Sequence, residues 1–374
     1  MAFKTITAEE LRDKTDNRDD ILILDVRNPE DYAYWKIEGK TVRTLNIPYF
    51  DFLDNKKAGE PYLPKESEVI IVCAKGVSSQ MVTEILADQG YHVASLEGGM
   101  RAWSQVYHRT PVIEAENLKL YQVRRPAKGC LSYLMISGDE ALVLDPNRHV
   151  DQYMKWAEED GARITTIVDT HMHADHISGA QELAQKTGAD YYISSADAKD
   201  LFHNYKRLEK QDGVLFGEAD VKVIALETPG HTPGSVSLLV KDRYLLSGDT
   251  LFVGGPGRPD LGGNPEVRGK MLFETIFGRL GEMPEDIVVF PGHYAGIEEI
   301  DENGAVWDTL GRIRERSDVM QIRDQGQFLQ AVIKNLPETP PNYENILQVN
   351  GGRKQVGDEE AIDMETGPNN CAIG

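Results

Sequence analysis

The sequence has few cysteines and lacks long hydrophobic runs. Three of its 374 residues are cysteine, an odd number that cannot form a disulfide framework and that favours reduced thiols. The longest apolar run covers residues 69–74, whereas a membrane-spanning helix needs about 18 apolar residues. The first residues, which include Lys4, Glu9 and Glu10, lack the apolar stretch of a secretory signal. We therefore expect a cytoplasmic protein without a membrane segment.

Positive charge is also scarce. Forty basic residues stand against 61 acidic ones, which gives a formal net charge of −21. A surface of this charge repels phosphate backbones and anionic lipids, so we expect neither nucleic acid nor membrane as a partner. An anionic substrate would need a site that supplies positive charge locally. The length favours two or three domains, and a homo-oligomer remains open.

The first segment, residues 1–108, has the pattern of an α/β domain with a parallel sheet. Residues 21–24 and 69–72 are continuous apolar runs, which are typical of strands buried on both faces. Residues 79–86 have apolar positions at helical spacing, and Gly90 marks the expected end of that helix.

Cys73 lies where the second apolar run meets this helix. The carboxyl end of a strand is where α/β sheets place ligands. Loop amides, the positive end of the helix and the charge of Lys75 favour an anion at this position, and the thiolate is the reactive form of cysteine. The position alone is equally compatible with a buried core cysteine.

Several motifs of this segment together resemble a single rhodanese domain. They are Asp25-Val26-Arg27 with Glu30, Asn46-Ile47-Pro48, the loop Cys73-x-x-Gly76-x-Ser78, and Glu97-Gly98-Gly99-Met100-x-Ala102-Trp103. The resemblance implies that Cys73 accepts a sulfane sulfur as a persulfide and passes it to a nucleophile, with Lys75, Gly76 and Ser78 binding the substrate. Many members of the family carry arginine where this chain has Ser78, and their usual Gly-His-Ile is here Trp35-Lys36-Ile37.

A second segment, residues 115–350, combines strands and helices in the way expected of a β-sandwich covered by helices. Residues 104–114 show no period and contain Pro111, so we expect a linker there. Cys130 begins a strand pattern and is expected to pack in the core. Residues 351–374 are a C-terminal tail. The expected strands are residues 118–123, 130–136, 141–144, 164–168, 221–225 and 287–290, and the expected helices are 150–159 and 177–186.

Histidine and aspartate gather in this segment in short motifs next to predicted strands. Two histidines separated by one residue in an extended loop point the same way, so both imidazoles can reach one metal ion. A single motif of this kind is usually a surface or core feature, but four of them at strand ends predict a metal centre. The residues are His171, His173, Asp175 and His176 in one motif, then His231, Asp249 and His293.

This set of residues resembles the metallo-β-lactamase fold, which implies an αββα sandwich with the metal site at one edge of its two sheets. The residue types leave the number of metal ions open. In the first arrangement His171, His173 and His231 hold one ion, and Asp175, His176 and His293 hold a second, with Asp249 bridging them. In the second, His171, His231 and Asp249 alone form a two-His-one-carboxylate triad that suits mononuclear Fe(II).

The stretch Gly254–Gly263 and the ends at residues 340–350 and 367–372 resemble the persulfide dioxygenases. This resemblance implies that Fe(II) on the triad serves the oxidation of glutathione persulfide by O2 to sulfite and glutathione. His173, Asp175, His176 and His293 would then support the ligands or hold a second metal. Arg258 would fix the loop or an anionic substrate, and an ion pair with Asp260 is the alternative.

The joining of the two resemblances suggests a bifunctional enzyme of sulfide oxidation, in which thiosulfate, persulfide and sulfite are the small-molecule partners of the rhodanese cysteine. The alternative is a zinc-dependent thioester hydrolase of the glyoxalase II type, with the rhodanese part as a sulfur-binding or regulatory module. The role of Cys371 stays open.

Overall fold

The computed structural model describes residues 4–17, 19–208, 216–217, 221–261, 263–334, 336, 339 and 341–368. The chain divides by its internal contacts into two compact units. Unit 1 comprises Met1–Tyr107, Arg125–Lys128 and Thr366–Pro368, and unit 2 comprises the rest of the chain. Residues 262, 340 and 369–372, including Cys371, belong to the motifs above but lie outside the described residues.

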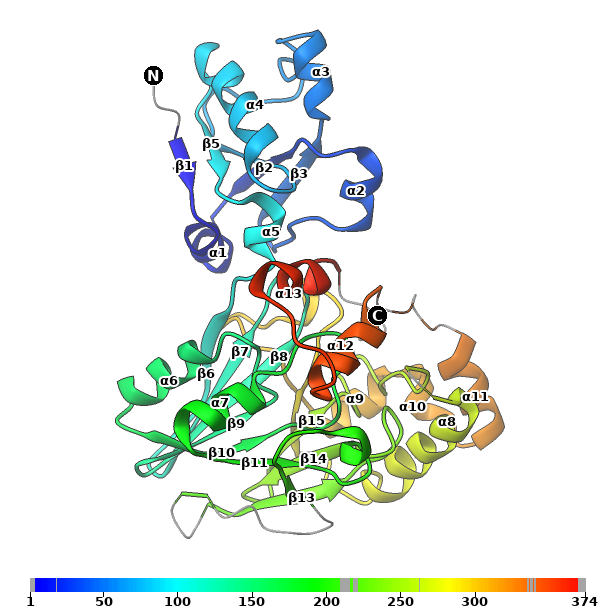
Figure 1. Ribbon diagram of the computed structural model, residues 1–374. Coiled ribbons are helices and arrows are strands. Elements are labelled where there is room, and N and C mark those ends of the chain that lie inside the picture. Colours follow the sequence, from blue (N-terminus) through cyan, green and yellow to red (C-terminus); the bar gives the residue numbers. More distant parts are fainter. Residues whose placement is uncertain are drawn as a thin grey trace. The chain divides into compact units, whose positions relative to one another are not determined.

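Unit 1 is built on a parallel sheet that has five strands within its described residues, in the order β1-β5-β4-β2-β3 (Figure 1). Helices α1 (Ala8–Asp16), α2 (Pro29–Tyr34), α3 (Tyr49–Asp54), α4 (Val77–Asp88) and α5 (Gly99–Trp103) connect or follow the strands. The strands are β1 (Lys4–Ile6), β2 (Ile21–Asp25), β3 (Val42–Asn46), β4 (Val69–Val72) and β5 (Val93–Leu96).

The apolar runs of β2 and β4 supply two cores, one on each face of this sheet. Ile21 and Ile23 pack into one cluster with Trp103, while Leu22 and Leu24 pack into the other with Phe52. Side chains alternate between the faces of a strand, so a strand covered on both faces is apolar at every position. This confirms the predicted α/β fold of the first segment.

Unit 2 contains two sheets that face each other. The first has the order β12-β11-β10-β9-β8-β7-β6 and the second the order β13-β14-β15-β16-β17. Their strands are β6 (His108–Ala115), β7 (Leu118–Arg124), β8 (Leu131–Ser137), β9 (Glu140–Leu144), β10 (Arg163–Val168), β11 (Asp190–Ile193), β12 (Lys206–Arg207), β13 (Val223–Glu227), β14 (Val236–Val240), β15 (Tyr244–Gly248), β16 (Val288–Pro291) and β17 (Asp308–Thr309).

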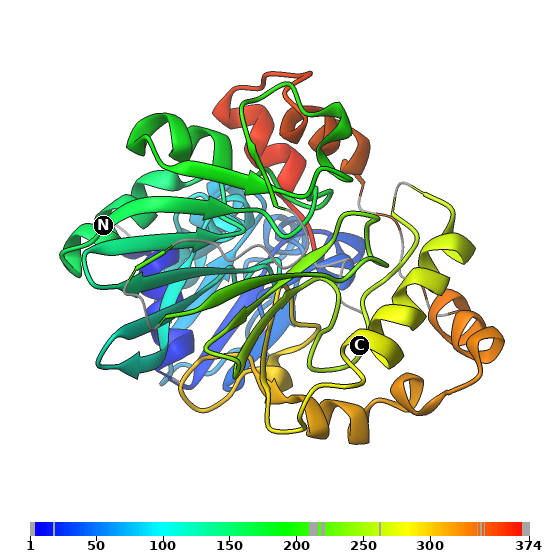
Figure 2. The same ribbon diagram turned by 90° about the horizontal axis from the view of Figure 1, so that it is seen from below.

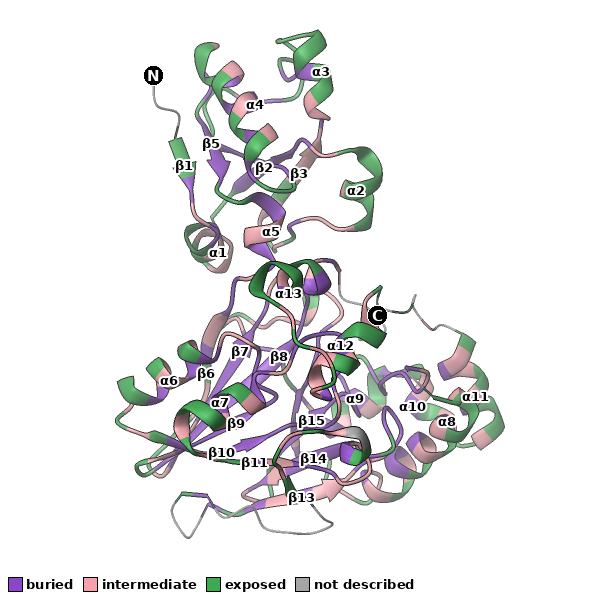
Figure 3. Cartoon of the chain, viewed as in Figure 1, coloured by how far each residue is buried: buried purple, intermediate pink, exposed green. Residues whose placement is uncertain are grey.

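Alternating side chains again explain the layers. On β15, Leu246 points into the cluster between the sheets. This cluster also contains Tyr133 and Met135 of β8. Leu245 points the other way, into a second cluster beneath the helices on the outer face. Figure 2 shows the two sheets with helices on both outer sides, and Figure 3 shows the strands mostly buried. The predicted αββα sandwich is confirmed.

Helices cover the outer faces of both sheets. Helices α6 (Val150–Glu159) and α7 (Ala180–Thr187) lie on the first sheet. The second sheet is covered by α8 (Pro265–Glu274), which continues into a π-helical stretch (Thr275–Arg279), and by α9 (Leu310–Arg316), α10 (Asp318–Gln321) and α11 (Gln325–Lys334). Helix α12 (Tyr343–Asn350) and helix α13 (Asp358–Glu365) pack around Ile177. None of the helices in the described part of the chain is long and apolar enough to cross a membrane.

One expectation about the organisation of the chain is wrong. Residues 108–114, expected as part of a linker, belong to β6, which lies at the edge of the first sheet. Pro111 interrupts the apolar pattern, and the pairing of β6 with β7 shifts register between Pro111 and Ile113. Proline has no N–H to donate and is tolerated at sheet edges and bulges, so the residue that suggested a linker marks an edge strand.

Candidate functional site

Cys73 lies in the loop between β4 and α4 of unit 1, as the sequence predicted. The backbone N–H of Gly76 donates to its sulfur at 3.1 Å, and the hydroxyl of Ser79 lies 3.4 Å from the same atom. The Cys73 residue is 5% exposed, whereas Lys75 is exposed and Ser78 is partly exposed. The sulfur therefore accepts a hydrogen bond from the Gly76 N–H and, as a thiol, donates to the Ser79 hydroxyl, while Lys75 is an exposed residue of the same loop.

The glycine-rich turn after β5 holds this loop in place. The N–H of Met100 donates to the Cys73 carbonyl at 2.9 Å, and the N–H of Arg101 donates to the Ala74 carbonyl at 3.1 Å. A Cβ on Gly99 would lie 2.1 Å from the Cys73 oxygen, and the φ of Gly99 is +59°. Only glycine permits this close approach of two backbones, which explains the paired glycines of the motif.

The histidine motifs of unit 2 lie in loops that follow the ends of neighbouring strands. His171, His173, Asp175 and His176 follow β10, and His231 lies in the turn between β13 and β14. Asp249 comes directly after β15, and His293 comes two residues after β16. All seven side chains are buried. The fold thus brings the predicted residues of unit 2 to one edge of the sandwich.

His171, His231 and Asp249 form one compact group. Their ligand atoms lie within 4.8 Å of one another. The Asp249 Oδ2 atom is 3.9 Å from the Nε2 of His171 and 3.7 Å from the Nε2 of His231. These distances are too long for hydrogen bonds and leave space for an ion between the three atoms.

The outward-facing nitrogens of both imidazoles are occupied. The Nδ1 of His231 donates to the carbonyl of Arg258 at 2.8 Å. The Nδ1 of His171 lies 2.9 Å from the Thr170 hydroxyl, which itself donates to Asp145, so this nitrogen is the donor to Thr170. Both rings therefore present a lone pair on Nε2, the form in which histidine binds a metal.

The chemistry of this group fits a cation. The Asp249 Oδ2 is a buried atom that accepts no hydrogen bond from the described residues, and a buried carboxylate oxygen without a partner is costly. Burial lowers the pKa of His171 and of His231, so both rings are neutral at pH 7. A metal ion would supply the positive charge that neutral rings cannot.

His173 points to a different set of groups. Its Nε2 lies 3.0 Å from Asp145 and 3.8 Å from Asp169. Burial lowers the pKa of His173, but the carboxylate of Asp145 outweighs burial and the net pKa is raised. Its Nδ1 is buried and has no hydrogen-bond partner among the described residues. This nitrogen keeps His173 available as a further ligand.

The remaining motif residues are hydrogen-bonded to one another. The Nδ1 of His293 is 2.8 Å from Asp249 Oδ1, and its Nε2 is 3.0 Å from Asp175. Asp175 also contacts His176 at 3.0 Å. Burial raises the pKa of Asp175, but these imidazoles outweigh burial and hold the pKa well below its ordinary range. The set is therefore a hydrogen-bonded network that supports Asp249.

Cys130 is buried, as predicted, but it does more than fill the core. Its sulfur lies 3.2 Å from Asp175 Oδ2, and it forms a β-bridge with His293. Burial raises the pKa of the Cys130 thiol, but His293 and His176 outweigh burial and the net pKa is lowered. Cys130, Asp175 and His176 form a second group that could hold a metal.

Arg258 is not exposed. The residue is fully buried, and its guanidinium makes two hydrogen bonds of 2.7 Å with Asp260. Its carbonyl accepts the hydrogen bond from His231. The structure contains the alternative ion pair with Asp260, and Arg258 also belongs to the loop whose carbonyl orients His231.

One supporting residue, Asp145, escaped the sequence analysis. Asp145 accepts hydrogen bonds from the Thr170 N–H and the Thr170 hydroxyl, at 2.7 and 2.9 Å, besides its contact with His173. Its position directly after β9 was the available signal, because that strand is parallel to β10 and ends at the same sheet edge.

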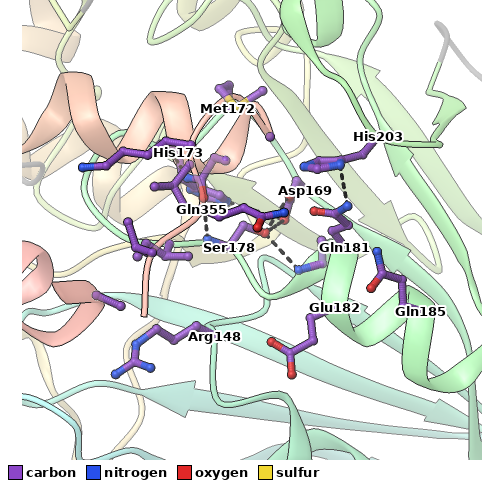
Figure 4. Close-up of a pocket in the computed structure, with 18 of the residues that line it drawn as sticks. Arg148, Asp169, Met172, His173, Ser178, Gln181, Glu182, Gln185, His203 and Gln355 are labelled. Carbon is purple, nitrogen blue, oxygen red and sulfur yellow. Dashed lines mark hydrogen bonds and ion pairs between the residues drawn. The ribbon is translucent and has the colours of Figure 1, made fainter. Parts of the chain in front are cut away.

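A cavity of about 420 Å³ adjoins the motif loop. Met172 and His173 line one side, Gln181 and Gln185 of α7 line another, and the segment after α12 lines a third (Figure 4). Figure 4 shows Gln181 hydrogen-bonded to His203. The cavity therefore borders the motif loop at Met172 and His173.

Comparison with known proteins identifies both units. The model of the rhodanese-like domain matches residues 7–106, and the model of the metallo-beta-lactamase superfamily matches residues 125–293. The probable metallo-hydrolase YqgX of Bacillus subtilis is 33% identical over 180 residues, which is 43% of this chain and 83% of that protein. The chain belongs to the metallo-beta-lactamase superfamily.

Other relatives of the metallo-beta-lactamase unit have different activities in their names. The hydroxyacylglutathione hydrolase of Anaeromyxobacter dehalogenans is 35% identical over 46% of this chain and 65% of its own length. The human mitochondrial persulfide dioxygenase ETHE1 is 32% identical over 46% of this chain and 67% of its own length. Both chemistries therefore occur among proteins that are about equally similar to the metallo-beta-lactamase unit.

Solved structures agree on the fold. A metallo-beta-lactamase from Staphylococcus aureus has a TM-score of 0.58 and 28% identity, covering 65% of this chain and 75% of that chain. ETHE1 from Myxococcus xanthus has a TM-score of 0.52 and 20% identity, covering 67% of this chain and all of that chain. The membership of the superfamily implies a metal centre and does not decide between iron and zinc.

The role of Asp145 can be tested by Asp145→Ala. The change removes the acceptor for the Thr170 N–H and for His173, and each buried group left without a partner costs about 1–3 kcal/mol. We expect a loss of about 3 kcal/mol in the free energy of unfolding and reduced retention of metal, measured by urea unfolding and elemental analysis. Asp242→Ala is the matched control, because Asp145 and Asp242 both have a positive φ (51° and 50°) but Asp242 is exposed. Equal effects of the two changes would show that only the backbone conformation matters.

Proposed function

We propose that the metallo-beta-lactamase unit is an Fe(II)-dependent persulfide dioxygenase that oxidises glutathione persulfide with O2 to sulfite and glutathione. The observation that carries the proposal is the grouping of His171, His231 and Asp249, whose ligand atoms lie within 4.8 Å of one another. Two imidazoles and one carboxylate with open positions are typical of mononuclear non-haem iron oxygenases. The human relative named as a persulfide dioxygenase supports this choice.

The hydrogen bonds of the other motif residues support a mononuclear site. Asp175, His176 and His293 contact one another, and His293 also holds the Oδ1 of Asp249. A second ion at these residues would have to replace their mutual hydrogen bonds. We therefore assign them to holding Asp249, so that its Oδ2 alone faces the metal position.

The residues around the metal position orient the ligands and exclude bulk water. Thr170 and the Arg258 carbonyl fix the protonation of the two histidines, which turns their Nε2 lone pairs toward Asp249. All three ligand residues are at most 3% exposed, so bulk water has little access to the group. Bound Fe(II) supplies the redox chemistry between O2 and the terminal sulfur of the substrate.

We propose further that the rhodanese-like unit is a sulfurtransferase in which Cys73 carries the sulfane sulfur. The Gly76 N–H and the Ser79 hydroxyl near its sulfur suit an anionic sulfur atom. Thiosulfate, persulfide and sulfite are the proposed substrates and products. The partly exposed Ser78 and the exposed Lys75 lie at the surface of the same loop, where an anionic donor could bind.

A zinc-dependent hydrolase of the glyoxalase II type is the second candidate. The Nδ1 of His173, which has no hydrogen-bond partner among the described residues, favours it, because a hydrolytic site would use this histidine as a third imidazole ligand. The relatives named as hydroxyacylglutathione hydrolases support the same chemistry. His173 is therefore the residue at which the two candidates differ.

Oxygen consumption tests the proposal directly. We expect protein that is purified without oxygen and loaded with Fe(II) to consume O2 on addition of glutathione persulfide, forming one sulfite for each O2. An oxygen electrode and a sulfite assay measure the two quantities. Zinc-loaded protein that cleaves an S-acyl glutathione, with no oxygen uptake in the iron-loaded form, would establish the hydrolase instead.

Two histidine variants separate the candidate ligand sets. We expect His231→Ala to lose bound metal, because it removes one of three ligands. His173→Ala should retain metal within about twofold, because the proposed role of His173 is its contact with Asp145. Elemental analysis after gel filtration gives the metal content of each folded variant. Loss of metal from both variants alike would place His173 among the ligands and favour the hydrolase.

Cys73→Ser tests the independence of the two activities. We expect transfer of sulfur from thiosulfate to cyanide to fall at least 1,000-fold, on the order of the effect of removing a catalytic nucleophile, while oxygen uptake with glutathione persulfide remains. Thiocyanate formation and oxygen uptake are measured on the same preparation. Unchanged thiocyanate formation in Cys73→Ser would leave the rhodanese-like unit without a catalytic cysteine.

A further inference from the structure

We propose that Ser79 is a catalytic residue of sulfur transfer, and that Ser95 is a positioning residue that acts through it. The two serines form a chain of hydroxyls that ends on the sulfur of Cys73. This inference rests on the proposed role of Cys73 and names groups that stabilise its charge. The family motif that includes Cys73, Gly76 and Ser78 does not contain either serine.

The contacts form a continuous path from strand β5 to the reactive sulfur. The Ser95 hydroxyl donates to the Ser79 hydroxyl, with 2.9 Å between the oxygens. The Ser79 hydroxyl lies 3.4 Å from the Cys73 sulfur. Ser79 belongs to the first turn of α4, and Ser95 belongs to β5, which pairs with β4 through Ile71. Two regular elements therefore fix both oxygens relative to the sulfur.

The burial of both hydroxyls indicates a role beyond packing. Ser79 and Ser95 are both 0% exposed, and a buried hydroxyl is costly unless it is hydrogen-bonded. Alanine fits a helix and valine fits a buried strand without that cost. Each serine is instead paired with the next group in the chain, and the last group is a sulfur that becomes anionic during the reaction.

The direction of the hydrogen bonds suits the anionic sulfur. A hydroxyl has one proton to donate and two lone pairs. When Cys73 is a thiol, its S–H can donate to Ser79. When the sulfur carries negative charge, Ser79 can donate to it, because Ser95 already fills a lone pair of Ser79 and not its proton. The same contact thus serves both protonation states.

The step that gains most is the discharge of the persulfide. In the charging step, the Cys73 thiolate attacks the outer sulfur of thiosulfate, the S–S bond breaks, and sulfite leaves with the electron pair. In the discharge step, cyanide attacks the outer sulfur of the persulfide. The bond between that sulfur and Cys73 breaks, thiocyanate leaves, and the Cys73 sulfur takes the electron pair. A donor at this sulfur stabilises it as the leaving group.

The loop residues 75 and 78 do not place a buried cation at the sulfur, so a neutral donor has a part to play. Position 78 is serine and supplies no guanidinium, and the charged group of Lys75 belongs to an exposed residue. The Gly76 N–H is one donor to the sulfur, at 3.1 Å. Ser79 is a second, and it reaches the sulfur from the helix side. Two neutral donors at a buried sulfur provide stabilisation that does not depend on a nearby cation.

Single-turnover discharge by cyanide tests the relay in the full-length protein. The variants Ser79→Ala and Ser95→Ala and the double variant are first charged with thiosulfate, and thiocyanate formation is then followed. We expect Ser79→Ala to slow discharge about tenfold or more, which corresponds to the loss of one hydrogen bond to a charged group. Ser95→Ala should slow it about threefold, because it weakens the donor without removing it. The concentration of thiosulfate needed for half-maximal charging should change less than twofold.

Thr83→Val is the matched control. Thr83 is also 0% exposed and lies on the same helix, but its hydroxyl donates to the backbone carbonyl of Ser79 and not to the sulfur. We expect this variant to discharge within twofold of the wild-type rate. Circular dichroism and urea unfolding identify any variant that does not fold.

The double variant distinguishes a relay from general weakening of the loop. If Ser95 acts through Ser79, the double variant should discharge at the rate of Ser79→Ala alone, whereas independent effects multiply. A wild-type rate of discharge in Ser79→Ala would overturn the proposal. So would a further threefold loss of rate when Ser95→Ala is added to Ser79→Ala. If Ser79→Ala does not fold, the comparison of Ser95→Ala with Thr83→Val decides, because equal rates contradict the relay.

Discussion

The centre of unit 2 depends on a single carboxylate whose two oxygens have different partners. Asp249 Oδ1 is hydrogen-bonded to His293, and Oδ2 faces the imidazoles of His171 and His231. Hydrogen bonds at the Nδ1 atoms of these two rings orient their Nε2 atoms toward Oδ2. A buried anion of this kind is stable only when positive charge is placed next to it. The network through Asp175 and His293 holds the carboxylate of Asp249 in place, and the loop of Arg258 holds His231 beside it.

The sequence was sufficient to predict both folds and the gathering of the motif residues, for a physical reason. Continuous apolar runs such as Ile21–Asp25 are possible where a sheet is covered on both faces. Polar residues that follow such strands, such as Asp249 after β15, then share the sheet edge at which the strands end. Strand ends are local features, so they can be located without knowledge of the tertiary structure.

Features that depend on contacts between distant segments could not be predicted in this way. The full burial of Arg258 is one such feature, because the neighbouring residues of the motif do not reveal which segments pack over the Arg258–Asp260 pair. Cys130 reads as core, yet its sulfur contacts Asp175, 45 residues away. Ser95 lies inside a buried strand and carries no motif, and its partner on α4 is visible only in three dimensions. Pro111 was misleading because proline is tolerated in edge strands as well as in linkers.

The boundary of unit 1 has a consequence for how the protein can be divided. The chain leaves this unit at Tyr107 and returns to it with Arg125–Lys128. There the Ala127 carbonyl accepts the indole N–H of Trp35 at 2.9 Å, and Arg125 donates to the Ser104 carbonyl at 2.7 Å. A fragment that ends at residue 107 would lack both partners and would expose the indole. Because unit 1 includes residues from beyond the first strand of unit 2, a single cut between the two units does not yield an intact unit 1.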